Sequence, residues 1–315
     1  MKILNLKITS DFIVNSLCTL TLGVGVAEYT TNVLLTNVYV KYFKEEYKNG
    51  HPVPLSESLR KRYDSVVQDL KYTEFQKAFS TPFIVESLKP TSIGCLNTRS
   101  GSYIGIPNTY ELNTINDISV LNVDNSELQT YIQLMNDNTE FGQKFMESLI
   151  LSEPAKKYSI AREMILADNY RLFIKSLSCP GTLIPMYALG STILSAIPPN
   201  PVKIRALAFF LLCNVGVILW LFIRTAIEYF YQSEVEKTIC DIGEEYIHGG
   251  IEYNKKLIQR NLALRNIIPD GRKIISEEGN EIPLFSIFTE SLHHKIKYLE
   301  HRLKECKDNK NETLT

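Results

Sequence analysis

The longest unbroken apolar stretch of the chain runs from Ala206 to Ile223 and lies between Arg205 and Arg224. Twelve of its eighteen residues are Leu, Phe, Ile or Val, and the polar Asn214 is the exception. As an α-helix this stretch is ~27 Å long, close to the ~30 Å thickness of a bilayer's hydrocarbon core. The pattern therefore predicts a transmembrane helix.

A second uncharged stretch, Ser176 to Val202, comes just before it. Its apolar centre, Gly181 to Ile197, forms a helix of ~25 Å, and a proline-rich connection joins the two stretches into a predicted helical hairpin turning at Pro198, Pro199 and Pro201. Small residues on the second stretch would let a neighbouring helix approach closely: Gly181, Ala188, Gly190, Ser191, Ser195 and Ala196. A hairpin buried in a large soluble core is the alternative.

A third apolar stretch, Phe12 to Ala27, follows Lys2 and Lys7 and ends at Glu28. It is interpreted either as a retained first span or as a cleaved signal peptide, and its Asn and Thr residues favour the retained span. Positive residues in the hairpin turn and at the N-terminus place both on the side from which the protein is inserted. Residues 36–175 and the C-terminal part then share the opposite side, although Arg171, Lys175 and Arg224 oppose this orientation.

Outside these stretches the pattern predicts both helices and strands. Leu55 to Phe79 has helical periodicity with Ser56 as a cap, and Pro82 to Asp124 has short apolar runs typical of a small antiparallel sheet. Glu140 to Leu177 is predicted to be helical and to lead directly into the second span.

After the predicted span Ala206 to Ile223, which is the third along the chain, an apolar stripe from Ile227 to Leu257 predicts one long amphipathic helix. Gly249 and Gly250 interrupt it, so either another helix packs tightly there or the helix bends. Lys273 to Phe285 is predicted to form a hairpin at Gly279 and Asn280, and Leu292 to Leu303 a last helix before a mobile polar tail.

The predicted fold class is an α-helical multi-pass membrane anchor, made of a helical hairpin plus an N-terminal span, with a mixed α+β domain outside the membrane. The predicted divisions are residues 1–35 for the first span, 36–175 for the soluble α+β domain, 176–224 for the hairpin and 225–315 for the long helix, small hairpin, terminal helix and tail.

Composition excludes several classes of protein. The 315 residues include 34 basic and 35 acidic side chains, a balance that disfavours a dedicated nucleic-acid binder. A mean hydropathy of −0.07 excludes a polytopic channel or transporter, but not a few membrane spans in an otherwise soluble chain. The six cysteines form no CxxC pair, so neither a disulfide framework nor a zinc module is indicated.

No catalytic motif emerges, and the sequence predicts no catalytic, cofactor or metal site. The histidines His293, His294 and His301 lie near Glu290, Glu300 and Cys306. On a helix, His294 and His301 are ~10 Å apart, so a solvated face is favoured over a shared metal ion. The alternative is a membrane-bound metal-handling protein or enzyme that uses this cluster, and a secretory-pathway membrane protein is a weaker option.

Several strings in the C-terminal half resemble the transmembrane protein 177 family. They are HGGIEYNKKL from His248, NLALRNII from Asn261, Gly271, and GNEIP from Gly279, with looser matches at SIAREM from Ser159 and YIGIP from Tyr103. The chain departs from the family pattern at His248, where a small or thiol residue is expected, and in its N-terminus.

The resemblance implies a multi-pass protein of the mitochondrial inner membrane, similar to an assembly factor for cytochrome c oxidase. Such proteins associate with newly made subunit II and its membrane chaperone and stabilise both before copper is inserted. The insertion side would be the matrix, and the soluble portions would face the intermembrane space.

We therefore expect a non-enzymatic scaffold that holds a client membrane protein in the lipid bilayer. Seven residues of the recognised strings are the candidate interaction surface, and tight internal packing of the same segment is the alternative: Gly249, Gly250, Glu252, Tyr253, Asn261, Leu264 and Arg265.

Overall fold

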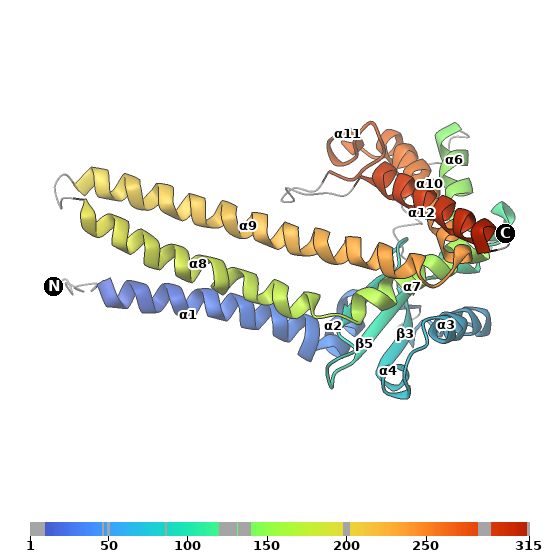
Figure 1. Cartoon of the computed structure of the whole chain (residues 1–315), viewed down its shortest axis with the longest axis horizontal. Helices are drawn as coiled ribbons and strands as arrows, with labels where there is room; N and C mark the ends of the chain where they lie inside the picture. The colour runs from blue at the N-terminus through green and yellow to red at the C-terminus, as the bar shows by residue number, and fades with distance from the viewer. Residues whose placement is uncertain are drawn as a thin grey trace.

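Three long helices extend from one end of a mixed helical and stranded body (Figure 1). The structure is a computed structural model and describes residues 10–45, 47–48, 51–85, 87–119, 131, 140–197, 202–282 and 291–313. The long helices are α1 (Ser10–Tyr29), α8 (Arg171–Ala196) and α9 (Val202–Cys240). Helix α8 contacts both α1 and α9.

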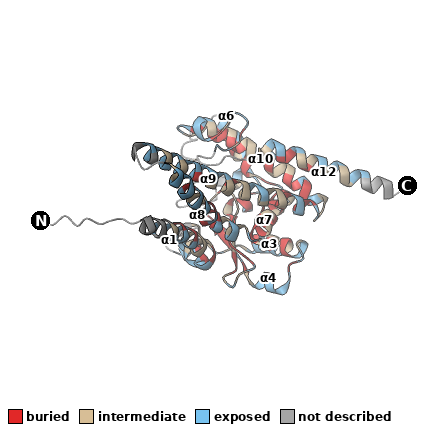
Figure 2. Cartoon of the chain, turned by 60° about the vertical axis from the view of Figure 1, so that its left-hand side comes forward, coloured by how far each residue is buried: buried red, intermediate tan, exposed pale blue. Residues whose placement is uncertain are grey.

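Two helices in the described part of the chain are long and apolar enough to cross a membrane, Arg171–Ala196 and Ala206–Cys240. Only 6% of the apolar window in the second is buried, and 28% in the first. A hairpin in a soluble core would be mostly buried, so this alternative does not fit the structure. Figure 2 shows the exposed surfaces along α8 and α9. The predicted proline turn lies at residues 198–201, outside the described residues.

Helix α1 passes through a short π-helix, η1 (Thr30–Leu34), into α2 (Thr36–Phe43). A two-residue antiparallel pair follows, β1 (Tyr47–Lys48) and β2 (His51–Pro52). Helices α3 (Glu57–Asp69) and α4 (Glu74–Ala78) confirm the amphipathic helices predicted there. The Ser56 hydroxyl accepts a hydrogen bond from the Leu59 amide, which confirms the predicted cap.

The small sheet has the strand order β3-β5-β4, with β3 (Ser80–Val85), β4 (Thr91–Gly94) and β5 (Ser102–Pro107). Strand β4 is antiparallel to β5, but β3 is parallel to β5, with Ile84 opposite Ile106. The prediction of an antiparallel sheet is therefore wrong for one of the two pairings. Strand β5 lies between the other two strands. After β4, the chain therefore turns back, and β5 enters the sheet between β4 and β3 in the same direction as β3. Two short 3-10 helices follow, η2 (Asn108–Glu111) and η3 (Ile115–Ser119).

The segment from Glu140 to Leu177, predicted to be helical and to lead directly into the second span, is divided among three helices: α6 (Glu140–Leu149), α7 (Glu153–Ala167) and α8. The break before α7 has a local cause. Ser152 caps the helix by accepting from the Ala155 amide, and Pro154 lies in the first turn, where a missing N–H costs nothing.

The stripe predicted as one long helix is likewise divided, because α9 ends at Cys240 and α10 (Glu244–Ile267) begins after a short turn. Helices α11 (Gly271–Ile274) and α12 (Leu292–Thr313) follow. Ile275 pairs with Glu281 across the predicted hairpin, whose far end at Phe285 lies outside the described residues. The segment predicted to be a mobile tail is helical as far as Thr313, and Leu303 and Cys306 pack against a buried cluster that includes Ile247 and Leu299.

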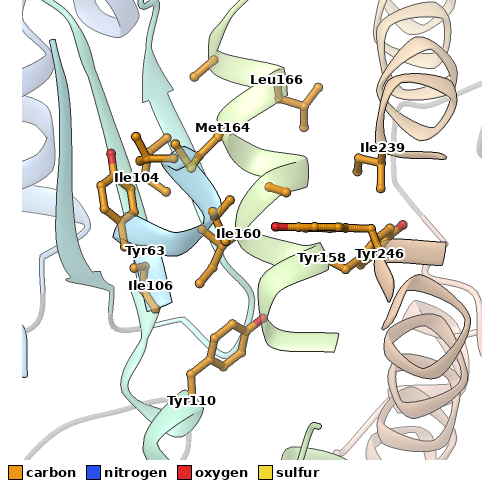
Figure 3. Close-up of a cluster of buried hydrophobic side chains, with 14 of the residues drawn as sticks. Tyr63, Ile104, Ile106, Tyr110, Tyr158, Ile160, Met164, Leu166, Ile239 and Tyr246 are labelled. Atoms are coloured by element: carbon orange, nitrogen blue, oxygen red, sulfur yellow. The ribbon is translucent and has the colours of Figure 1, made fainter. Parts of the chain in front are cut away.

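The main hydrophobic core lies where α7 crosses between the sheet and the helices α9 and α10. Figure 3 shows Ile104, Ile106 and Tyr63 on one side of α7, and Ile239 and Tyr246 on the other. Because the end of α9 enters this core, the membrane-length helix and the body share buried side chains.

Candidate interaction site

The two glycines of the predicted interaction surface bring α10 into close contact with α7. A Cβ on Gly249 would collide with the Pro154 carbonyl, and its distance to the Ala155 amide nitrogen would be 2.9 Å. A Cβ on Gly250 would lie 2.6 Å from the Tyr158 ring and 2.9 Å from Leu299 of α12. These glycines therefore permit tight packing of three helices. Of the two predicted roles for the glycine pair, tight helix packing or a bend in the helix, the structure shows the first.

The other five predicted residues also make internal contacts. Glu252 accepts hydrogen bonds from the Ser152 amide, at 2.9 Å, and from its hydroxyl, so it fastens α10 to the start of α7. The Tyr253 ring lies 5.7 Å from that of Tyr158. The remaining three residues contact the body as follows: Asn261 donates to the Gly279 carbonyl at 2.8 Å, Leu264 packs in a buried cluster with Phe145, and Arg265 donates to the Ile275 carbonyl at 3.2 Å.

A buried charge cluster joins α9 to the body. Glu236 of α9 is 2% exposed and accepts a 2.6 Å hydrogen bond from the Tyr158 hydroxyl. Arg162 of α7 and Lys295 of α12 approach the same carboxylate at 3.3 and 3.6 Å. Burial, together with the Glu236 charge, raises the pKa of Tyr158 well above its usual value, so this residue remains a hydrogen-bond donor.

Arg162 also pairs with the neighbouring Glu163 at 2.9 Å. Burial lowers the pKa of Arg162, but the charges of Glu163 and Glu236 outweigh this effect. The pKa of Arg162 is therefore above its usual value, and the guanidinium stays charged. The cluster thus consists of compensated charges, which is what allows them to lie in the interior. It holds α7, α9 and α12 in one arrangement and offers no free nucleophile or base.

A layer of ion pairs crosses the long helices where they meet the body. Glu28 of α1 accepts two hydrogen bonds from the Arg224 guanidinium of α9, at 2.6 and 2.9 Å. Glu228 of α9 pairs with Arg171 and, at 3.2 Å, with Lys175, both at the start of α8. The three positive residues that oppose the predicted orientation are therefore each paired with a carboxylate. Pairing reduces the cost of placing these charges beside an apolar layer.

Between the apolar parts of the same three helices lies a cavity of about 640 Å³. Its walls are mostly apolar and include Thr21 of α1, Leu183, Tyr187 and Gly190 of α8, and Leu212 and Gly216 of α9. Two of the small residues predicted for close helix contact, Gly190 and Ser191, line it. A Cβ on Gly190 would lie 3.4 Å from Leu212 of α9, an ordinary van der Waals distance, so Gly190 also lies at the contact between the two helices of the hairpin. We define this cavity between α1, α8 and α9 as the helix groove.

Among the residues that the structure describes, no group of three His, Cys, Asp or Glu side chains could hold an ion. Glu290, predicted to lie near the three histidines, is outside the described residues. His301 instead lies 3.3 Å from Glu305 on the same helix. His248 lines a shallow cavity of about 490 Å³ with Ser152, Glu252 and Lys255.

Sequence reasoning missed the buried charge cluster and the contribution of α1 to the helix groove. Glu236 lies between Val235 and Ile239 of the apolar stripe, and this position was the available signal for a buried carboxylate. The groove depends on how three helices meet, which periodicity within one helix does not encode.

Comparison with known proteins gives a consistent result. A family model described as Transmembrane protein 177 matches residues 19–311. Transmembrane protein 177 of Homo sapiens is 26% identical over 254 residues, which cover 79% of each chain. The relatives from Rattus norvegicus and Danio rerio are each 23% identical, with coverage of 79% and 83% of both chains. No solved structure matches the chain.

Proposed function

This chain belongs to the transmembrane protein 177 family, and we propose that it is a non-enzymatic, multi-pass membrane scaffold that holds the transmembrane segment of a client protein during its assembly. The helix groove is the observation that carries the proposal. It combines apolar walls, small residues and an opening between membrane-length helices, and such surfaces allow close van der Waals packing of helices in lipid.

We propose further that α1 is a retained membrane span, in addition to α8 and α9. Its Thr21 is buried, and a Cβ on Gly25 would lie 2.7 Å from the Ser176 carbonyl of α8. Cleavage after Ala27 would remove this contact and one wall of the groove. A retained α1 is therefore consistent with the groove as the working part of the protein.

The client that we propose is newly made cytochrome c oxidase subunit II, together with its membrane chaperone, in the mitochondrial inner membrane. The family resemblance supports this choice. In this arrangement the groove binds a client span, and the body, in the intermembrane space, shields the emerging domain and stabilises the client. The body is firmly attached to α9 through Glu236, as the shielding role requires.

The test replaces one groove residue and a matched neighbour. Ser191 lines the groove, whereas Ser195 lies one turn further along α8 and does not. Each hydroxyl donates to the carbonyl three residues earlier in the helix: Ser191 to Ala188 at 2.8 Å, and Ser195 to Thr192 at 2.7 Å. Ser191→Phe should fill the groove, and Ser195→Phe should add the same ring one turn beyond the residues that line it.

Pulse-labelled mitochondria carrying either variant would show the effect on the client. We expect Ser191→Phe to shorten the lifetime of new subunit II and to reduce its co-purification with the scaffold, and Ser195→Phe to retain both. Equal lifetimes and equal recovery in the two variants would contradict the groove as the binding site. Normal subunit II lifetimes after deletion of the gene would contradict the client itself.

A further inference from the structure

Helix α2 carries an exposed apolar face directly beyond the end of α1. Val38 and Tyr42 of α2 are 46% and 70% exposed, and Leu34 of η1 and Leu35, directly before α2, are 53% and 49% exposed. The opposite side of the segment is fixed to the body, because Val40 packs with Phe83, Val85 and Ile93 of the sheet. The orientation of α2 is therefore determined by the body, and its apolar face points away from the core.

The distance along the chain places this face near the membrane boundary. Leu35 follows Glu28, in the layer of ion pairs, by seven residues, so a helix carries it at most ~10 Å further. The polar headgroup region of one leaflet is ~5–8 Å thick. The backbone leaves helical geometry at Leu35, with φ −103° and ψ 30°, and α2 begins after this bend. Figure 1 shows α2 at the level where α1 and α8 meet the body.

The charges on α2 fit a lipid surface. Lys41 lies on the same face, with its ammonium 5.8 Å from the centre of the Tyr42 ring. Lys44 follows at the end of the helix, and in the described ranges neither lysine forms an ion pair. An apolar face with tyrosine and lysine at its edge is typical of helices that lie in the interface plane, where the ring stays at headgroup level and the ammonium reaches phosphate.

We infer that α2, with the two leucines before it, is an interfacial segment: Leu34, Leu35, Val38 and Tyr42 insert at the boundary between headgroups and acyl chains, while Lys41 and Lys44 bind the phosphates of anionic phospholipids. The inference rests on the proposed membrane insertion of α1, α8 and α9. It adds a second attachment that fixes how the body sits on the bilayer. The competing occupant of this face is a protein partner.

The single tryptophan of the chain makes the inference testable with the full-length protein. Trp220 lies in α9 within the apolar stretch, so in the unsubstituted protein it should be quenched by phosphatidylcholine brominated along its acyl chains. A second protein carries Trp220→Phe and Tyr42→Trp, which moves the reporter to α2. A matched control carries Trp220→Phe and Phe141→Trp, because Phe141 is 41% exposed on α6, at the end of the body far from the long helices (Figure 1).

In nanodiscs of brominated phosphatidylcholine, we expect the tryptophan at position 42 to lose much of its emission and that at position 141 to keep it. Adding phosphatidylglycerol should increase the loss at position 42, and Lys41→Glu with Lys44→Glu should abolish the increase.

If position 42 is quenched no more than position 141 while Trp220 is quenched, the inference is wrong and a protein partner is the occupant of this face. If Trp220 itself is not quenched, the proposed membrane insertion fails. An effect that is identical in both lipids would overturn the role of the two lysines.

Discussion

At the scale of single residues, Gly249 determines how closely α7 and α10 approach. A side chain there would meet backbone atoms of Pro154 and Ala155, which have no rotamer to adjust, whereas the atoms near Gly250 belong to side chains. The helix terminus held by Ser152 and Glu252 lies at the same contact. Any displacement of Pro154 therefore also disturbs the cap of α7.

We accordingly predict that Gly249→Ala destabilises the protein by about 1–3 kcal/mol, because the gain of ~1 kcal/mol in helix propensity is smaller than the overpacking cost. Thermal unfolding in detergent would show a lower Tm. Gly181→Ala is the control, since a Cβ at Gly181 meets no atom within 4 Å. If the two variants unfold at the same temperature, the packing at Gly249 is not tight.

A second residue-scale prediction concerns Glu236. Glu236→Ala removes the acceptor of Tyr158 and one compensating charge from Arg162 and Lys295, both in the interior. Breaking a buried pair in this way costs about 3–5 kcal/mol. Glu234→Ala is the matched control, because Glu234 is 46% exposed and its pair with Lys237 lies in solvent, where such pairs contribute ~0–1 kcal/mol. Urea unfolding of both variants would measure the difference, and similar midpoints would show that the cluster stabilises nothing.

At the scale of elements, the Glu28–Arg224 pair connects α1 to α9 across the layer of charges. Reversing one member, as Glu28→Arg or Arg224→Glu, places like charges together on side chains that are only 19% and 30% exposed. We predict that each reversal lowers the free energy of unfolding by ~1–3 kcal/mol. The lower end of this range is favoured because the pair is partly solvated.

The double reversal should regain most of this loss, since the opposite charges again meet. A double-mutant cycle on thermal stability in detergent measures the coupling directly. Additive losses, with no recovery in the double variant, would mean that α1 is held by its apolar contacts with α8 alone.

The elements differ in how far the sequence predicts them. The apolar length of Ala206 to Ile223 and the cap at Ser56 are local features, and the helices that they predict are present. The parallel pairing of β3 with β5 depends on contacts between distant residues, so short apolar runs do not encode it. The stripe from Ile227 to Leu257 continues across the turn between α9 and α10, and periodicity alone therefore does not reveal the break.

The candidate site shows the same division. The glycine pair in the stripe indicates close helix packing, but the identity of the partner, α7, follows only from the fold. The small residues of α8 indicate a helix contact, and the structure shows Gly190 at both the α9 contact and the groove. The position of Glu236 in the apolar stripe indicates a buried carboxylate, but its partners, Arg162 of α7 and Lys295 of α12, follow only from the fold.

At the scale of the whole molecule, α9 acts as a rigid connection between the membrane-length helices and the body. Its 39 residues give a helix of ~58 Å. Two sets of polar contacts fix its rotation: Glu228 pairs with Arg171 and Lys175 of α8, and Glu236 pairs with side chains of α7 and α12. Because both sets lie on one helix, the angle between the body and the long helices is defined.

Inserting one alanine between Tyr231 and Gln232 tests this connection, because it rotates the two sets by ~100° relative to each other and separates them by a further ~1.5 Å. The apolar stretch is unchanged, so the protein should stay in the pellet after alkaline carbonate extraction. Only one set of contacts can then form, and we predict that the body is digested faster by protease in intact membranes. An alanine inserted after Asp308, beyond Cys306, the last packed residue of α12, should leave digestion unchanged, since chain ends tolerate insertion. Equal digestion of both variants would show that α1 and α8 hold the body without α9.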